Sequence, residues 1–307
     1  MAKKLRVALR LLGTGTFDLS RPGNVQGDEQ VALGWQKYLL RREEVEAVFL
    51  LGPSDPCPER LSCLIAFNPF LERSEQTKNI LYLQNAFRRD HWEGGTAGVF
   101  NSVRDRFDGF IFTSNRLMKT CAEGAVIPFA TDPEVFYPQY SETYSHPVCF
   151  VGNDIRGAQV NHRFLVPAIP FGLVIYGNNT WAEPLRSRGR GRLPADDLPK
   201  VYSSVNVNLN CHIEEHILLD TVNLRLYDIL ACGGLVISDK VDSLEDFFGG
   251  AVICTEGYED LWAKLARYSG DSKGRRSLVD IGRRMVLGEH TYAHRVDALI
   301  NYLHDFL

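Results

Sequence analysis

NLRLYDILACGGLVISD, residues 223–239, is the stretch that decides the fold of this 307-residue chain. Apolar residues recur at helical spacing over roughly 222–232, and a short apolar run of strand length follows two glycines. Asp220 and Thr221 precede the helix and are both good N-terminal caps, while Gly233 suits the position just after a helix end. The stretch therefore predicts a capped helix, a glycine stop and a buried strand in direct succession.

Two charged side chains stand on this helix three positions apart, Arg225 and Asp228, so that they project from one face. A helix N-terminus concentrates N–H groups and partial positive charge, which suits a diphosphate, and Arg225 could add a bidentate contact. Asp228, one turn further on, could accept hydrogen bonds from two hydroxyl groups. We therefore expect a ligand with both phosphate and hydroxyl groups. The alternative is a solvated Arg225–Asp228 ion pair that contributes less than about 1 kcal/mol.

Apolar runs of strand length alternate with helical or irregular stretches along the chain. The expected strands are 5–12, 45–52, 63–70, 80–87, 109–114, 125–130, 148–153, 171–178, 205–212 and 251–257, and the other expected helices are 28–42, 258–268, 274–287 and 292–307. Strands alternating with helices predict parallel sheets covered on both faces. The proline-containing residues 131–147 break the pattern and read as a linker. We predict an α/β fold of two αβα domains with a cleft between them.

Composition limits the classes of function. The formal net charge is -4 and the sequence pI about 6.1, so global charge does not indicate nucleic-acid binding. No apolar run approaches the ~20 residues that span a bilayer, and Arg6 and Arg10 interrupt the apolar start, which favours a first strand over a signal peptide. We expect a cytoplasmic protein without a membrane span. The seven cysteines are scattered without a C-x-x-C pair, which argues against a disulfide framework or a cysteine-based zinc site.

Glycine or polar residues follow several expected strands. These strand ends are Gly13–Thr16, Gly152-Asn153, Gly177-Asn178 and Asn210–His212. Ligands of open α/β sheets gather beyond the carboxyl ends of the strands, although a single glycine there is usually only a turn. The residues that we assign to a ligand site on this ground are Gly15, Gly152, Asn153, Asn178 and His212. Arg156 is either a second phosphate ligand or a surface arginine.

A series of motifs runs through residues 125–300 in a fixed order. It comprises ATDPEVFYP (130–138), FVGN (150–153), IYGN (175–178), Leu198-Pro199 before Tyr202, the Asn-rich strand 205–210, NLRLYDILACGG (223–234) and EHTYAHR (289–295). This order resembles the C-terminal domain of the group-1 (GT4-like) glycosyltransferases. Within that group it is most similar to the bacterial branch typified by the spore-maturation protein CgeB.

The resemblance implies a GT-B architecture, in which two Rossmann-like domains face a central cleft and the second holds most of a nucleotide sugar. Residues 1–140 would form the acceptor domain and residues 146–290 the nucleotide-sugar domain. Residues 291–307 would form a closing helix that packs back on the N-terminal domain.

The resemblance also assigns roles by position. Asn223 and Arg225 would lie near the diphosphate, with Leu224 in the same donor site. Asp228, where many relatives have glutamate, would take the ribose or sugar hydroxyls. The backbone near Arg192 and Leu193 would hold the base.

The expected reaction is transfer of a sugar from a nucleoside diphosphate sugar to an unidentified hydroxyl acceptor. The sequence contains no D-x-D pair, which argues against a metal-bound donor, so we expect no metal and no cofactor beyond this co-substrate. Relatives in the group mostly retain anomeric configuration. Asp90 and His91 are candidate catalytic residues on the acceptor side, or else an exposed loop pair, and the nearby Trp92 and Phe87 could stack on a sugar or simply pack.

Three other functions remain open. One is a nucleotide-sugar epimerase on the same fold, and another is a catalytically silent nucleotide-sugar-binding protein. A third is a zinc hydrolase, because HIEEH (212–216) matches H-x-x-E-H. That pattern requires a helix, whereas here it directly follows an expected strand.

Overall fold

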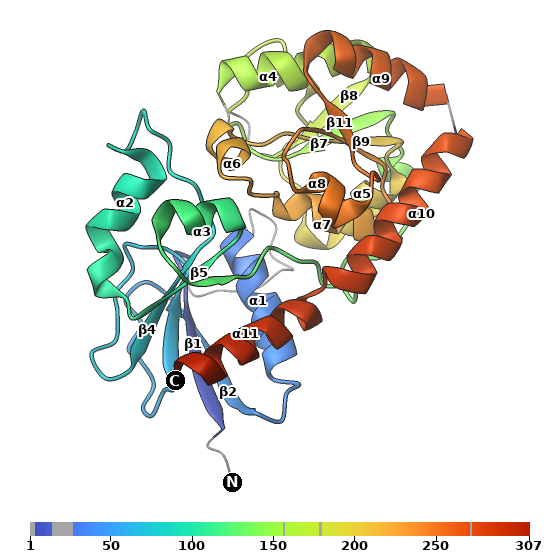
Figure 1. Ribbon diagram of the computed structural model, residues 1–307. Helices are drawn as coiled ribbons and strands as arrows, with labels where there is room; N and C mark the ends of the chain where they lie inside the picture. Colours follow the sequence, from blue (N-terminus) through green and yellow to red (C-terminus); the bar gives the residue numbers. More distant parts are fainter. Residues whose placement is uncertain (1–3, 14–26, 156, 178–179, 271) are drawn as a thin grey trace.

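Two lobes, each built on one parallel sheet, make up the computed structural model (Figure 1), which describes residues 4–13, 27–155, 157–177, 180–270 and 272–307. Three predicted ligand residues, Gly15, Arg156 and Asn178, lie outside the described residues. Within the described residues, no helix combines the length and the apolar character needed to cross a membrane.

The first lobe has a six-stranded sheet in the order β2-β1-β3-β4-β5-β6. Its strands are β1 (Leu5–Arg10), β2 (Val45–Leu51), β3 (Cys63–Ala66), β4 (Lys78–Leu83), β5 (Gly109–Phe112) and β6 (Ala125–Val126). Its helices are α1 (Gly27–Leu39), α2 (Gly95–Val103) and α3 (Asn115–Cys121). The inner strand β3 is buried at every residue, as a parallel strand covered on both faces must be, which explains its continuous apolar run.

The second lobe has a five-stranded sheet in the order β11-β10-β9-β7-β8. Its strands are β7 (Val148–Val151), β8 (Leu173–Tyr176), β9 (Val207–Asn210), β10 (Val236–Asp239) and β11 (Ile253–Thr255). Its helices are α4 (Ala158–Phe164), α5 (Leu198–Ser204), α6 (Glu214–Leu218), α7 (Leu224–Ala231), α8 (Leu244–Phe248), α9 (Tyr258–Gly270) and α10 (Ser272–Glu289). After β7 the chain forms β8 on one side of β7 and then β9 on the other side of β7. The strand order therefore reverses between β7 and β9, and a ligand crevice is expected at the carboxyl ends of these strands.

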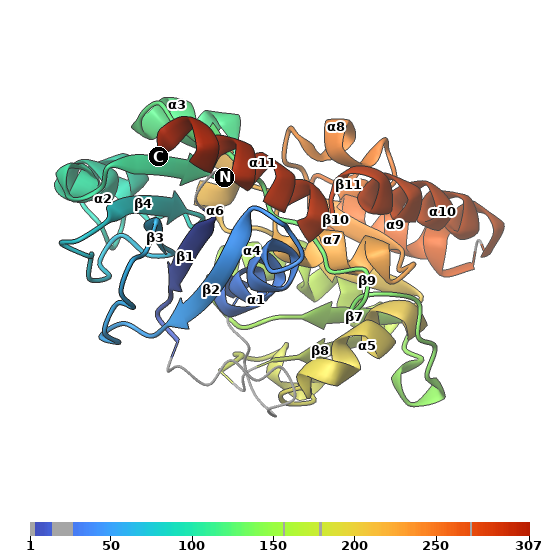
Figure 2. The same cartoon turned by 90° about the horizontal axis from the view of Figure 1, so that it is seen from below.

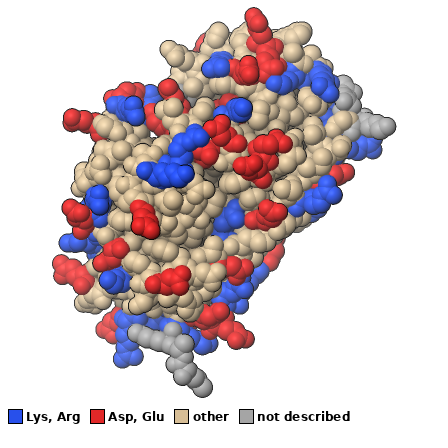
Figure 3. Space-filling view, in the orientation of Figure 1, with Lys and Arg blue, Asp and Glu red and all other residues tan. Residues whose placement is uncertain are grey.

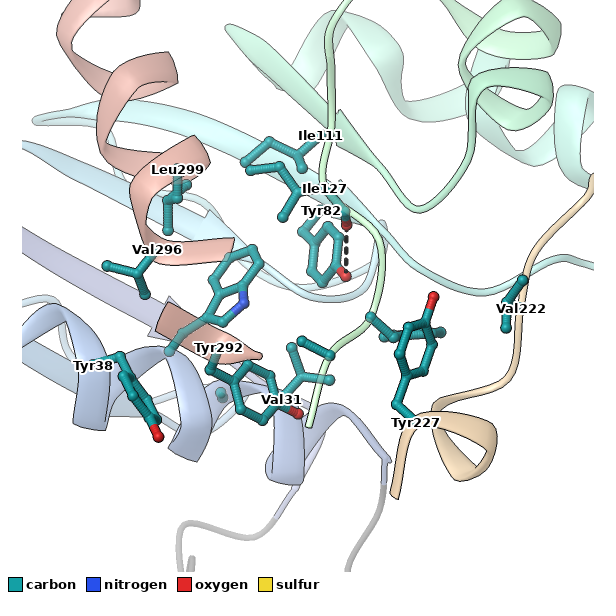
Figure 4. Packing of buried hydrophobic residues seen from close by; sticks show 14 of the residues in the cluster. Val31, Tyr38, Tyr82, Ile111, Ile127, Val222, Tyr227, Tyr292, Val296 and Leu299 are labelled. Carbon is teal, nitrogen blue, oxygen red and sulfur yellow. Dashed lines mark hydrogen bonds between the residues drawn. The ribbon is translucent and has the colours of Figure 1, made fainter. Parts of the chain in front are cut away.

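The last helix, α11 (Tyr292–Phe306), returns from the second lobe and packs along the first (Figures 1 and 2). Val296, Leu299 and Leu303 on this helix are fully buried in a cluster with α1 and the first sheet. Figure 4 shows Val296 and Leu299 in this cluster together with Tyr227 of α7. One apolar core therefore extends from the first sheet into the second lobe.

The chain crosses between the lobes twice, and the two crossings lie side by side. The Thr131 N–H donates to the His290 carbonyl and the Tyr292 N–H donates to the Thr131 carbonyl, both at 3.0 Å. Figure 3 shows basic and acidic side chains interspersed over the face that it draws. This face presents no large surface of positive charge for a nucleic acid.

Helix α7 ends as predicted but begins later than predicted. Gly233 follows its last turn with φ 70°, the left-handed conformation that glycine adopts without strain. The prediction of Asp220 or Thr221 as N-cap is wrong, because Asn223 holds that position. The Asp220 carboxylate instead accepts hydrogen bonds from the backbone N–H (2.9 Å) and hydroxyl (2.6 Å) of Ser243, which draws it away from the helix.

Candidate functional site

A pocket of about 250 Å³ lies at the carboxyl ends of β7 and β8, beside the N-terminus of α7. Six of the predicted donor residues line it, namely Gly152, Asn153, Leu193, Leu224, Arg225 and Asp228. Gly27 and Gln30 of α1 also line it, so the pocket has a wall from each lobe. We call it the donor pocket.

Arg225 is held at this pocket by two uncharged groups. Its Nη1 donates to the Asn210 side-chain oxygen at 2.7 Å, and its guanidinium carbon lies 4.9 Å from the centre of the Phe150 ring. Both contacts fix the direction of the guanidinium. Gly152 leaves the space for this arrangement, because a Cβ there would lie 2.8 Å from Arg225 Nη2 and 3.0 Å from the Phe150 ring. A side chain at 152 would therefore displace the Arg225 guanidinium or the Phe150 ring from these positions.

The N-terminus of α7 is positioned by a buried pair, His212 and Asp239. His212 Nδ1 lies 2.5 Å from Asp239 Oδ1, and the His212 backbone N–H donates to Asp239 Oδ2 at 2.8 Å. His212 Nε2 then accepts from the Asn223 backbone N–H at 3.1 Å. Burial opposes ionisation of Asp239, but the contacts with His212 outweigh it and lower the pKa of the carboxyl below its usual value.

His212 is therefore a positioning residue, and the expectation that it faces the ligand is wrong. Its side chain is fully buried and does not line the donor pocket. Asn223 does not line the pocket either, because its amide nitrogen donates to Asn210 Oδ1 and to the Cys211 carbonyl, both at 3.2 Å. These bonds tie the helix start to the end of β9.

Asp228 is only 3% exposed and joins three parts of the chain. One carboxylate oxygen accepts from the Thr131 hydroxyl at 2.8 Å, and the other accepts from the Gln30 amide at 2.7 Å. The solvated ion pair with Arg225 is therefore wrong as an alternative, because these two neutral partners hold the carboxylate. Burial raises the pKa of Asp228 to about 7, although both hydrogen bonds act to lower it.

The far end of the donor pocket is formed by the loop before α5. The Gly177 N–H donates to the Gly191 carbonyl at 2.9 Å, which lays the loop along the end of β8 and brings Arg192 and Leu193 to the pocket. A Cβ on Gly177 would lie 2.1 Å from the Gly152 carbonyl oxygen. The two glycine-containing strand ends are thus in direct contact, and only glycine fits at 177.

Asp90 and His91 lie on an exposed loop of the first lobe. The Asp90 carboxylate binds the Arg88 guanidinium at 3.0 and 2.5 Å, and these hydrogen bonds lower the pKa of Asp90. His91 lines a larger hollow of about 860 Å³ between the lobes, whereas Asp90 does not. The two side chains are nevertheless neighbours, because His91 Nε2 lies 3.8 Å from Asp90 Oδ2.

The zinc pattern HIEEH fails on its geometry. His212 lies before the helix, since α6 begins at Glu214, and both of its ring nitrogens are engaged by Asp239 and Asn223. His216 Nδ1 lies 3.2 Å from Asn223 Oδ1. Across the described ranges, no group of three or more His, Cys, Asp or Glu side chains is arranged to hold a metal ion.

Sequence reasoning missed Gln30, Thr131 and Asp239. Asp239 ends a strand, so the rule that found the other strand ends would have found it as well. Gln30 and Thr131 reach Asp228 from 198 and 97 positions away in the chain, and no local pattern indicates such contacts.

Residues 158–301 match the family model described as "Glycosyl transferase-like". No curated protein sequence matches the chain.

Three solved structures illustrate its fold. A sucrose-phosphate synthase from Thermosynechococcus elongatus is 13% identical with a TM-score of 0.70, over 98% of this chain and 99% of that one. AviGT4, a glycosyltransferase involved in avilamycin A biosynthesis, is 15% identical with a TM-score of 0.68, over 98% of each chain. Anabaena HepE, solved in complex with UDP-glucose, is 9% identical with a TM-score of 0.68, over 98% of this chain and 100% of that one.

The likeness to these structures confirms the predicted fold, two parallel-sheet α/β domains of the GT-B type. Together with the family match, it supports the prediction that the chain is a glycosyltransferase.

Proposed function

We propose that this chain, a GT-B protein with a glycosyl transferase-like domain, moves a sugar from a nucleoside diphosphate sugar to a hydroxyl group without a metal ion and with retained configuration. The observation that carries the proposal is the donor pocket, where Arg225 and the start of α7 meet the ends of β7 and β9. The similarity to a protein solved with UDP-glucose supports a nucleotide sugar as donor. The order of the motifs supports the finer assignment to the CgeB-like branch of group 1.

The pocket suggests how a donor would lie. The diphosphate would contact Arg225, Asn153 and the N-terminus of α7, where anions are favoured. The base would lie against the backbone at Arg192 and Leu193. The ribose or sugar hydroxyls would approach Asp228 and share or replace its bond to Gln30.

In this proposal residues 1–140 hold the acceptor and residues 146–290 hold the donor, with residues 291–307 closing the first lobe. The division agrees with the position of the donor pocket, most of whose lining comes from the second lobe.

The chemistry rests on charge that develops during the reaction. As the bond between the anomeric carbon and the diphosphate oxygen breaks, negative charge grows on the diphosphate. Arg225 and the α7 N-terminus would stabilise that charge, and because Asn210 and Phe150 already hold the guanidinium, little reorganisation is needed. If the acceptor hydroxyl attacks the anomeric carbon from the face on which the diphosphate leaves, the departing diphosphate oxygen can take the hydroxyl proton. No strong enzymic base is then required.

The test is to incubate the protein with UDP-, GDP- and dTDP-sugars in the presence of EDTA and to measure release of nucleoside diphosphate. Release that survives chelation is expected. Arg225→Ala should lower turnover by about 10²-fold or more, because it removes the guanidinium that stabilises the negative charge developing on the diphosphate. Arg276→Ala, at an exposed site on α10, is the matched control and should leave turnover unchanged.

Other outcomes would replace the proposal. Turnover that EDTA abolishes would refute the metal-independent reaction, and unchanged kinetics in Arg225→Ala would refute the role of that residue. Recovery of an epimerised donor would identify an epimerase. Tight nucleotide-sugar binding with no product would identify a silent binding protein.

A further inference from the structure

The hollow of about 860 Å³ between the lobes adjoins the donor pocket. Its wall on the first lobe is loop 86–92, which precedes α2, and Figure 1 shows this side of the lobe facing α4 and α6. Gly152 and Asn153 line the donor pocket, whereas Asp154 and Ile155 line the hollow. The same segment after β7 therefore borders both, and a molecule in the hollow would lie next to a bound donor.

An indole ring forms a fixed platform on the first-lobe wall. Trp92 is 41% exposed and stacks on Phe70, with ring centroids 5.1 Å apart and planes at 17°. Phe87 meets both rings edge-on, and its backbone N–H donates to the Thr96 hydroxyl at 2.8 Å. Because these contacts already hold the indole, little side-chain freedom is lost when a ligand stacks on it.

The opposite wall is also apolar. Ile155 on the second lobe is 60% exposed, although it borders the same hollow as Trp92. Pro184 and Leu185 continue this wall. Large apolar side chains exposed on both sides of one hollow mark a ligand site.

The charges of the hollow disfavour an anion. Arg88 lines it, but its guanidinium is paired with Asp90. Asp154 and Glu183 add carboxylates on the other wall, where Asn161 donates to Asp154 Oδ1 at 2.7 Å. The described lining residues thus include two carboxylates on this wall, beside the imidazoles of His91 and His162. A phosphate or carboxylate would lie near these carboxylates, whereas a hydroxyl finds hydrogen-bond acceptors.

We propose that the hollow receives the acceptor, and that the acceptor is an uncharged molecule built on a flat apolar ring that carries the reacting hydroxyl. This inference rests on the proposed function. The ring would lie between Trp92 and Ile155, with its hydroxyl toward the segment shared with the donor pocket. The hydroxyl oxygen then bonds to the anomeric carbon as the carbon–diphosphate bond breaks, and its proton leaves with the diphosphate.

The experiment uses three probes and two variants of the full chain. The probes are 2-naphthol, naphthalene-2-carboxylate as the same ring with a negative charge, and methyl β-D-glucopyranoside as an uncharged saccharide. Trp92→Ala removes the platform. Trp262→Ala is the matched control, since Trp262 is 49% exposed on α9 and also makes one aromatic contact, with Phe171. Calorimetry gives each dissociation constant, and circular dichroism checks that both variants fold.

The unaltered chain should bind 2-naphthol more tightly than the other two probes. Trp92→Ala should weaken this binding about tenfold, the size of a stacking contact, and Trp262→Ala should not change it. No binding of 2-naphthol, equal binding by Trp92→Ala, or tighter binding of the carboxylate or the glucoside would overturn the ring-bearing acceptor, even with donor turnover intact. Trp92-dependent binding in a chain that turns over no nucleotide sugar would refute the transferase and the acceptor role with it.

Discussion

At the scale of single residues, Asp228 is the least ordinary group of the site. A carboxylate buried among neutral partners is costly to ionise, which is why its pKa rises to about 7. Its two partners come from α1 and from the first crossing between the lobes. The residue that we expect to recognise donor hydroxyls therefore also joins the lobes, so donor binding and lobe contact share one carboxylate.

Asp228 should make the stability of the protein depend on pH. Its folded-state pKa of about 7 lies above the usual 3.8, so the folded chain binds the proton more tightly, and the free energy of unfolding falls as pH rises from about 4 to about 7. Asp228→Asn removes this titration, and Gln30 can turn its amide oxygen toward the new amide. The free energy of unfolding of the variant, relative to that of the unaltered chain, should therefore rise by about 2 kcal/mol from about pH 5 to about pH 7.

Urea unfolding at several pH values measures this difference. Asp305→Asn, at an exposed position of α11, is the control and should follow the unaltered chain at every pH. Parallel pH profiles for Asp228→Asn and the unaltered chain would show that the carboxyl is already ionised throughout.

Residue roles were predictable where a local rule applied. Arg225 and Gly152 were found from a helix start and a strand end, and the structure brings them to one pocket. The contact between Gln30 and Asp228 was not predictable, because Gln30 looks like any polar residue on a helix and its role depends on how the lobes meet.

At the scale of elements, the alternation of apolar runs was sufficient to predict both sheets, since buried parallel strands leave a clear signal. The ends of elements were harder. Asp220 and Thr221 have the chemistry of N-caps, yet Asp220 is bound to Ser243, a contact that depends on tertiary structure. His212 was placed at the right strand end, but its direction is set by Asp239 on the neighbouring strand.

The start of α7 should depend on His212 for stability. His212→Ala leaves the Asp239 carboxylate and the Asn223 N–H buried without this partner, so the free energy of unfolding should fall by about 2–4 kcal/mol. His304→Ala, at an exposed position of α11, should change it by less than about 0.5 kcal/mol.

A double-mutant cycle measures whether the pair acts as a unit. Asp239→Ala added to His212→Ala should cost clearly less than the sum of the single losses, because the second substitution removes the stranded charge. Additive losses would mean that the two side chains support the fold independently.

At the scale of the whole molecule, two lobes were predictable from the interrupted strand pattern, whereas their common core was not. Tyr227 of α7 belongs to the same apolar cluster as Leu299 of α11 and the strands of the first sheet (Figure 4). The periodicity of a helix shows that one face is buried but not against which lobe. The sequence therefore leaves open whether the lobes unfold separately.

The shared core predicts that the two lobes unfold together. Trp35 is buried in the first lobe and Trp181 in the second, whereas Trp92 and Trp262 are exposed. With both exposed tryptophans replaced by phenylalanine, Trp35→Phe leaves a probe of the second lobe and Trp181→Phe a probe of the first. Each variant's fluorescence transition in urea should have the midpoint that far-ultraviolet circular dichroism gives for the same protein, because a lobe that unfolded first would expose the apolar residues of the common cluster. A fluorescence midpoint that departs from the dichroism midpoint in either variant would mean that the contacts through α7 and α11 are too weak to couple the lobes, so that one lobe unfolds before the other.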